Sequence, residues 1–106
     1  MDRSTIKQYG HIVREINDLK AEIDTLKKDP RNYNNLIAVL DDQVDHLWRL
    51  REDIEARLWR LTSLERRIIR KKYFEGKPYK DIAAELHYSV DTVKKTAGAA
   101  LKKMED

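Results

Sequence analysis

Residues 79–98 read YKDIAAELHYSVDTVKKTAG, and this stretch decides the fold. Its two short amphipathic segments are separated by a turn that begins at His87. Two helices joined in this way, with apolar residues at fixed offsets and a small residue such as Ala83 at their crossing, are typical of a helix-turn-helix. The turn requires a left-handed backbone, and histidine is one of the residues that tolerate it. The side chains expected to fill the wedge between the helices are Ile82, Leu86 and Val93.

The flanking residues predict a further helix before this pair and set the length of the last helix. Residues 62–65 (TSLE) form a capping box, so a helix is expected to begin after Thr62 and to end near Phe74. Residues 75–78 (EGKP) then supply a glycine stop and a proline start for the next helix. The last helix is expected over 90–104. Its expected buried face consists of Val93, Ala97, Ala100, Leu101 and Met104.

The N-terminal half predicts an antiparallel helical hairpin. Apolar residues spaced alternately three and four apart indicate helices over 5–27 and 36–61, each with a coiled-coil-like stripe. Residues 29–35 (DPRNYNN) break the helix between them, because proline and asparagine favour turns. We therefore predict an all-α fold, with a hairpin domain over 1–61 followed by a helix-turn-helix domain over 62–106.

The composition excludes several classes of function. The 106 residues include no cysteine, so disulfides and thiolate metal sites are excluded. The histidines have no ligand spacing, and the sequence shows neither a Gly-rich phosphate loop nor a catalytic triad. We therefore expect no catalytic residues, no metal and no cofactor. Without an apolar leader or an apolar run of about 20 residues, the chain is expected to be cytoplasmic and outside the membrane.

Basic residues gather toward the C-terminus. Residues 1–61 hold 11 Lys and Arg against 12 Asp and Glu, whereas residues 62–106 hold 11 against 7. Seven of these basic residues lie within 66–80, where Glu75 is the one acid. A positive field on one part of a near-neutral chain indicates a polyanionic partner such as nucleic acid, although a solvated helix face has the same composition.

Residues 61–104 resemble region four of the sigma-70 family. The shared features follow one another in order: an ER pair at 65–66, YFEG at 73–76, Y-x-x-IA-x-x-L at 79–86 and YS-x-x-TVKK at 88–95. The N-terminal half does not resemble sigma region two. A helical leader before a domain of this kind is similar to small regulators of late transcription that phages and prophages encode.

The resemblance implies that the last helix docks in the major groove of DNA. Lysines and helix N-termini suit phosphates, whereas Thr92 or Asp91 can contact base edges. Other roles stay open: Ser89 as a helix cap, Asp91 as a complement to the helix dipole, and Val90 as a thymine-methyl contact or a packing residue. The residues implied to contact DNA are Lys77, Tyr79, Lys80, Ser89, Val90, Asp91, Thr92, Lys94, Lys95 and Gly98.

These features favour a sequence-specific transcriptional regulator that binds double-stranded DNA, with RNA polymerase as a further partner. A DNA-recognition packaging subunit of the small-terminase type is an alternative, and a helical adaptor without DNA binding is another. The second hairpin helix carries apolar residues outside its stripe, so we expect a homodimer through residues 5–61. These additional residues are Leu36, Trp48, Leu50 and Trp59.

Overall fold

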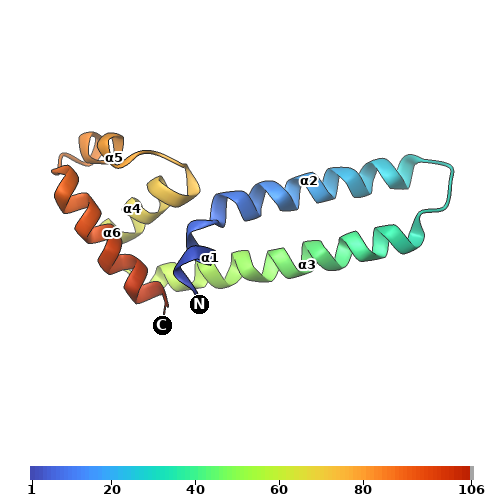
Figure 1. Ribbon diagram of the computed structural model, residues 1–106, viewed down its shortest axis with the longest axis horizontal. Coiled ribbons are helices and arrows are strands. Elements are labelled where there is room, and N and C mark those ends of the chain that lie inside the picture. The colour runs from blue at the N-terminus through green and yellow to red at the C-terminus, as the bar shows by residue number, and fades with distance from the viewer. Residues whose placement is uncertain (106) are drawn as a thin grey trace. The chain divides into compact units, whose positions relative to one another are not determined.

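The computed structural model describes residues 1–105, and they form the all-α fold that the sequence predicts. Six α-helices follow one another (Figure 1), and two short turns of other helical types join some of them. Within these residues, no helix combines the length and the apolar character that crossing a membrane requires. The elements are α1 (Arg3–Lys7), α2 (Tyr9–Lys28), α3 (Asn34–Arg57), the 3-10 turn η1 (Leu58–Arg60), α4 (Ser63–Ile69), the π-helical turn η2 (Arg70–Phe74), α5 (Tyr79–Leu86) and α6 (Val90–Glu105).

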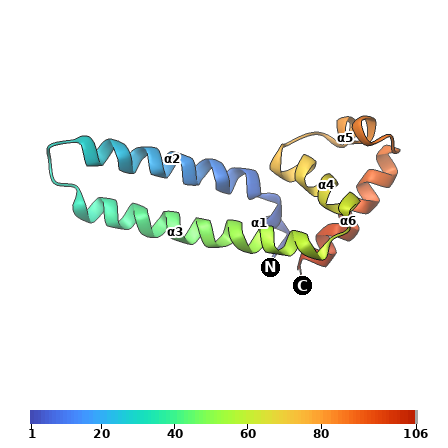
Figure 2. The same ribbon diagram turned by 180° about the vertical axis from the view of Figure 1, so that it is seen from behind.

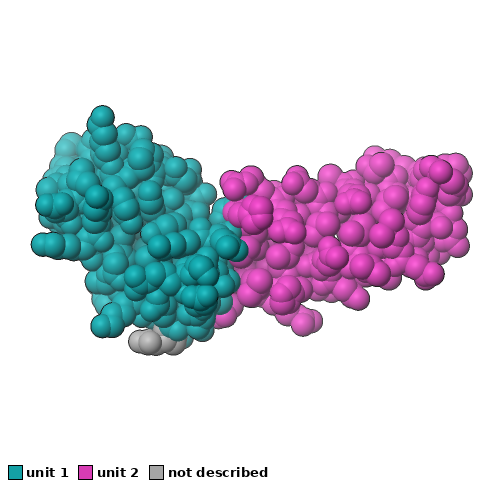
Figure 3. All heavy atoms as spheres, in the orientation of Figure 1, with its two compact units in different colours: residues 1–10, 54–106 teal, residues 11–53 magenta. Residues whose placement is uncertain are grey.

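The chain divides into two compact units (Figure 3). The terminal unit contains residues 1–10 and 54–106, and the hairpin unit contains residues 11–53. The sequence predicts a boundary after Leu61 instead. The difference arises because α1, the end of α3 and η1 contribute buried side chains to the terminal unit. These side chains are Ile6, Ile54 and Leu58, all of them 0–1% exposed.

Helices α2 and α3 run antiparallel through the hairpin unit (Figures 1 and 2), as the heptad spacing predicts. In the loop between them, the Asp29 carboxylate accepts hydrogen bonds from the backbone N–H and the guanidinium of Arg31. Three large apolar side chains of α3 are left exposed, namely Leu36, Val39 and Trp48. The buried stripe of the unit consists of Ile12, Ile16, Ile23, Leu40 and Val44.

The first predicted helix is interrupted at Gln8, where the periodicity indicates one continuous helix over 5–27. The interruption accompanies packing within the terminal unit, where α1 lies against α6. Tyr9 stacks on Phe74 with the ring centroids 3.6 Å apart, and its hydroxyl donates a hydrogen bond to the Glu55 carboxylate. Tertiary contacts of this kind override a local helical preference.

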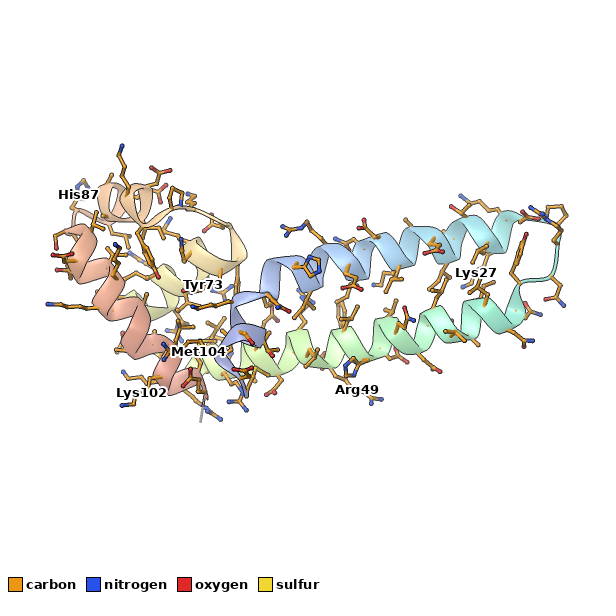
Figure 4. All side chains as sticks on the ribbon, viewed as in Figure 1. Lys27, Arg49, Tyr73, His87, Lys102 and Met104 are labelled. Carbon is orange, nitrogen blue, oxygen red and sulfur yellow. The ribbon has the colours of Figure 1, made fainter. Side chains whose placement is uncertain are left out.

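Helices α4, α5 and α6 form the helix-turn-helix part of the terminal unit. Helix α6 packs against both α4 and α5, and all five residues of its predicted inner face, from Val93 to Met104, are buried. Figure 4 labels Met104 at the C-terminal end of this face. Ile82 and Ala83 of α5 are buried in one cluster with Val93 and Ala97 of α6, and Leu86 packs against this cluster. Each fully buried large aliphatic side chain contributes about 1.5–3 kcal/mol, so this cluster fixes α6 on the unit.

The predicted capping box at the start of α4 is present. The Thr62 hydroxyl accepts a hydrogen bond from the Glu65 N–H at 3.2 Å, and the Glu65 carboxylate accepts one from the Thr62 N–H at 2.9 Å. Glu65 also pairs with Lys103 of α6 at 2.9 Å. Burial raises the pKa of Glu65, but the hydrogen bonds from Lys103 and Thr62 outweigh it, and the pKa lies below its ordinary value.

Candidate nucleic-acid interface

Helix α6 turns one face to the core and the opposite face to solvent. At roughly 100° per residue, Asp91 and Lys95 lie opposite the buried Val93, and Thr92 and Lys94 lie on the flanks. All four side chains are exposed. The N-terminal half of α6 therefore presents two ammonium groups, a hydroxyl and a carboxylate on its outer surface.

The turn before α6 has the backbone that the sequence predicts. His87 ends α5 with φ 60° and ψ 39°, in the left-handed region (Figure 4). Ser89 then caps α6: its hydroxyl oxygen accepts from the Thr92 N–H at 3.1 Å, and its hydroxyl hydrogen is donated to Thr92 Oγ1 at 2.8 Å. Ser89 thus serves the helix, while Thr92 keeps a hydroxyl hydrogen to donate. Val90, in the first turn, is 37% exposed.

Tyr79, at the start of α5, brings together two lysines from different elements. The Lys72 Nζ lies 4.3 Å from the centroid of the Tyr79 ring, and the Lys94 Nζ lies 6.0 Å from it. Burial raises the pKa of the neighbouring Tyr73, as does its hydroxyl contact with Tyr79 at 3.3 Å. Because an aromatic ring attracts cations, the Tyr79 ring is a shared neighbour of Lys72 of η2 and Lys94 of α6.

The π-helical turn η2 follows α4 and carries Lys71 and Lys72. The backbone N–H of Glu75 donates to the carbonyl of Arg70 at 2.9 Å, one residue farther back than in an α-helix, and the N–H of Lys77 donates to the carbonyl of Lys71 at 2.9 Å. The sequence predicts a helix up to Phe74, and the segment does end there, but its last turn is π-helical. Short π-helical turns are frequent at functional sites.

Lys77 forms ion pairs within the terminal unit. Its Nζ lies 2.7 Å from Glu85 Oε1 and 3.8 Å from the Glu75 carboxylate, while Lys71 Nζ lies 2.7 Å from Glu85 Oε2. The hydrogen bonds from Lys71 and Lys77 lower the pKa of Glu85 to about 2. The hydrogen bond to Glu85 likewise raises the pKa of Lys77. A single carboxylate therefore neutralises part of the positive surface.

The remaining two predicted residues lie on the outside of their helices. Lys80 is exposed in the first turn of α5. Gly98 lies within α6, and a Cβ placed there would meet no atom within 4 Å. The fold therefore does not require glycine at this position, although glycine weakens a helix interior.

The charges of the chain separate between the two units. The terminal unit carries 15 basic and 9 acidic residues, and the hairpin unit carries 7 basic and 10 acidic ones. The unit that contains the helix-turn-helix is therefore the positive one. This distribution is the electrostatic signature of a protein that binds a polyanion.

Comparison with known families agrees with this geometry. Residues 51–104 match the family described as sigma-70, region 4. The chain belongs to the sigma-70 region 4 family. The match confirms the resemblance and makes this part of the chain a DNA-binding helix-turn-helix domain rather than a catalytic one. No curated protein and no solved structure matches the chain.

The matched segment of the region 4 domain begins before the helix-turn-helix. It starts within α3, so it includes Ile54 and Leu58, which the sequence analysis assigned to the hairpin. Both side chains belong to the terminal unit. The family match and the packing thus agree that the DNA-binding part of the chain extends upstream of Thr62.

Sequence reasoning missed three side chains of the region 4 surface. Lys71 and Lys72 were noted within the basic run 66–80 but not assigned to the site, and Glu85 was not noted at all. Lys71 meets Glu85 across 14 positions of sequence, and Lys72 meets Tyr79 through a π-helical turn. Neither contact leaves a periodic signal in the sequence.

Proposed function

We propose that this chain is a sequence-specific transcriptional regulator that places α6 in the major groove of double-stranded DNA. The observation that carries the proposal is the polar outer face of α6, where Asp91 and Lys95 lie between Lys94 on one flank and Thr92 on the other in a region 4 domain. The lysines suit phosphates, and the Thr92 hydroxyl can donate to a base edge. The residues proposed to contact DNA are Lys77, Tyr79, Lys80, Val90, Asp91, Thr92, Lys94, Lys95 and Gly98, with Ser89 as the cap that fixes the start of the helix.

The first experiment identifies the DNA and measures how binding depends on salt. Sequences that the protein enriches from random duplexes give the target, and the enriched duplex is then titrated at several salt concentrations. If about four to six phosphates are neutralised, log K should fall against log salt with a slope of roughly −3.6 to −5.4. A slope near zero, or no enriched sequence, would contradict the proposal.

A pair of matched variants tests the role of α6. Lys94→Ala combined with Lys95→Ala removes two charges from the proposed groove face, and Lys27→Ala combined with Lys28→Ala removes two from the end of α2. We expect the first pair to flatten the salt slope by up to about 1.8, which corresponds to two phosphate contacts, and the second pair to leave it almost unchanged. Equal effects would show that only net charge matters.

Base recognition is tested at Thr92. If its hydroxyl donates to a base edge, Thr92→Ala should reduce discrimination at one base pair by about 1–3 kcal/mol, and Thr92→Ser should restore much of it. Discrimination that is unchanged in both variants would remove Thr92 from the recognition surface. A loss in both would indicate a contact of the Thr92 methyl group instead.

We also propose that the chain forms a homodimer through residues 5–61. The support is the exposure of Leu36 and Val39, one helical turn apart on α3, at 44% and 53%, together with Trp48 farther along the same helix at 38%, because exposed large apolar side chains can mark an interface. A symmetric dimer would present two α6 helices to two half-sites. Val39 was not among the expected side chains; of the other two that were, Leu50 is half-buried, and Trp59 belongs to the terminal unit and carries Arg66 over its ring at 4.8 Å.

Sedimentation equilibrium on the full chain tests the dimer. We expect Leu36→Lys combined with Val39→Lys to give a monomer, and Ala84→Lys, on the exposed side of α5, to leave the dimer intact. A wild-type monomer at micromolar concentration would refute the interface.

RNA polymerase is part of the same proposal, because the likeness to sigma factors implies that partner. We also propose a phage or prophage source, because small phage regulators share the helical leader. Co-purification with core RNA polymerase tests the partner. The genes that neighbour this one test the source.

A further inference from the structure

Glu85 holds two lysines that come from separate segments. It lies on the exposed side of α5 and directs one carboxylate oxygen to each ammonium group: Oε2 to Lys71 of η2 and Oε1 to Lys77 of the following loop, both at 2.7 Å. All three side chains are partly exposed, so the cluster is open to a solute. The cluster lies in the terminal unit, which carries the proposed DNA-binding surface.

The arrangement of these charges matches the shape of a phosphodiester. A DNA phosphate also offers two anionic oxygens on one centre, and each lysine ammonium has three N–H donors that can be redirected to them. Lys77 lies two residues before the start of α5, close in sequence to the proposed phosphate contacts at Tyr79 and Lys80. Ion pairs between exposed side chains contribute little net stability, so a polyanion can displace the carboxylate.

We propose that Lys71 and Lys77 form a binding site for a backbone phosphate of DNA, and that Glu85 fills this site in the free protein and competes with DNA for both lysines. The inference rests on the proposed DNA-binding function and adds Lys71 to its contacts. Glu85 then acts as a built-in counter-ion that lowers the affinity for DNA and makes it less dependent on salt.

The competition is constant across ordinary conditions. A glutamate with the ordinary pKa of 4.5 is already ionised in the neutral range, and the lysines lower the pKa of Glu85 further, to about 2. DNA itself therefore has to displace Glu85, and a change of pH near neutrality does not release the lysines.

The test compares two variants that each remove one negative charge from α5. Glu85→Gln removes the carboxylate that contacts the lysines. Asp81→Asn is the matched control, because Asp81 lies in the first turn of the same helix and its charge acts on Lys77 only from a distance, whereas Glu85 contacts both lysines directly. Each variant, the wild type and the double variant Glu85→Gln with Lys71→Ala are titrated with a short mixed-sequence duplex over a range of salt concentrations. Far-UV circular dichroism shows that each variant keeps its helical content.

The proposal predicts that Glu85→Gln binds more tightly than both the wild type and Asp81→Asn at the same salt. Its slope of log K against log salt should be steeper than the wild-type slope by about 0.9, the value for one phosphate contact, and Lys71→Ala should remove about half of that gain. Equal binding by Glu85→Gln and Asp81→Asn would overturn the inference, because only net charge would then matter. Weaker binding by Glu85→Gln would also overturn it, since Glu85 would then position the lysines for DNA. Either result leaves the proposed function intact, whereas no binding by any variant would overturn both.

Discussion

Replacing Gly98 by alanine is expected to stabilise the protein and to weaken its binding to DNA. Gly98 lies inside α6, and a Cβ at this position would meet no atom within 4 Å, so alanine adds no clash within the chain. Glycine in a helix interior is about 0.8–1.0 kcal/mol less favourable than alanine. The free energy of unfolding of the terminal unit should therefore rise by about that amount. For a domain of this size, such a gain corresponds to a melting temperature about 4–8 °C higher.

The effect on DNA binding has the opposite sign. Gly98 follows Lys94 and Lys95 by one helical turn, so it shares the proposed groove face with them. An added methyl group there would stand between α6 and the DNA, and the affinity for the selected duplex should fall. Glycine permits the close approach of another backbone. Close contact with DNA is therefore a reason for glycine at position 98, where the fold does not require it.

Two measurements on the same protein separate these effects. Urea unfolding followed by circular dichroism gives the change in stability, and titration of the selected duplex gives the change in affinity. Ala99→Gly, at the adjacent exposed position, calibrates the cost of glycine in this part of α6. Undiminished DNA affinity in Gly98→Ala would refute the docking of this face, and a loss of stability would refute the open space beside Gly98.

Three further changes test the turn, the capping box and the surface near Tyr79. His87→Gly should raise the free energy of unfolding by about 1 kcal/mol in thermal or urea unfolding, because the left-handed backbone at His87 strains any side chain, and His87→Ala should give no such gain. The pKa of Glu65 is lower in the folded protein than its ordinary value of 4.5, so the Glu65 carboxylate contributes its full stabilisation above pH 4.5. This stabilisation is lost as the pH falls through the lower pKa of the folded state. Glu65→Gln should therefore lose less stability below pH 4.5 than the wild type. Lys72→Ala should flatten the salt dependence of DNA binding by about 0.9, whereas Lys102→Ala, near the end of α6, should change it much less. A slope that is the same in the wild type and in Lys72→Ala would remove Lys72 from the interface.

Local signals in the sequence predicted the helix-turn-helix closely. The buried face of α6 follows from the spacing of its apolar residues, and the capping box at Thr62 follows from two side chains three positions apart. The left-handed turn at His87 follows from the need to join two helices in three residues. In each case the physical cause lies within one helical turn of the residues that reveal it, so periodicity and capping rules suffice.

Contacts between distant segments could not be predicted in the same way. The interruption at Gln8 accompanies Tyr9 packing on Phe74, and the boundary of the terminal unit depends on Ile6 and Ile54. The heptad spacing continues through these positions without a break. A stripe of apolar residues indicates that a helix face is buried, but it does not identify the segment that packs against that face. The pairing of Glu85 with two lysines is hidden for the same reason.

The terminal unit is discontinuous in sequence, and this has a consequence for how such proteins can diverge. Its two segments meet where the Tyr9 hydroxyl contacts the Glu55 carboxylate, and residues 11–53 leave and return between them. The hairpin is therefore an insertion into the DNA-binding unit rather than a domain placed before it. Deletions or duplications of whole helical turns within α2 and α3 would preserve every contact of the unit that holds α6. The hairpin can thus change its length and its binding partners independently, while the first ten residues remain tied to the helix-turn-helix.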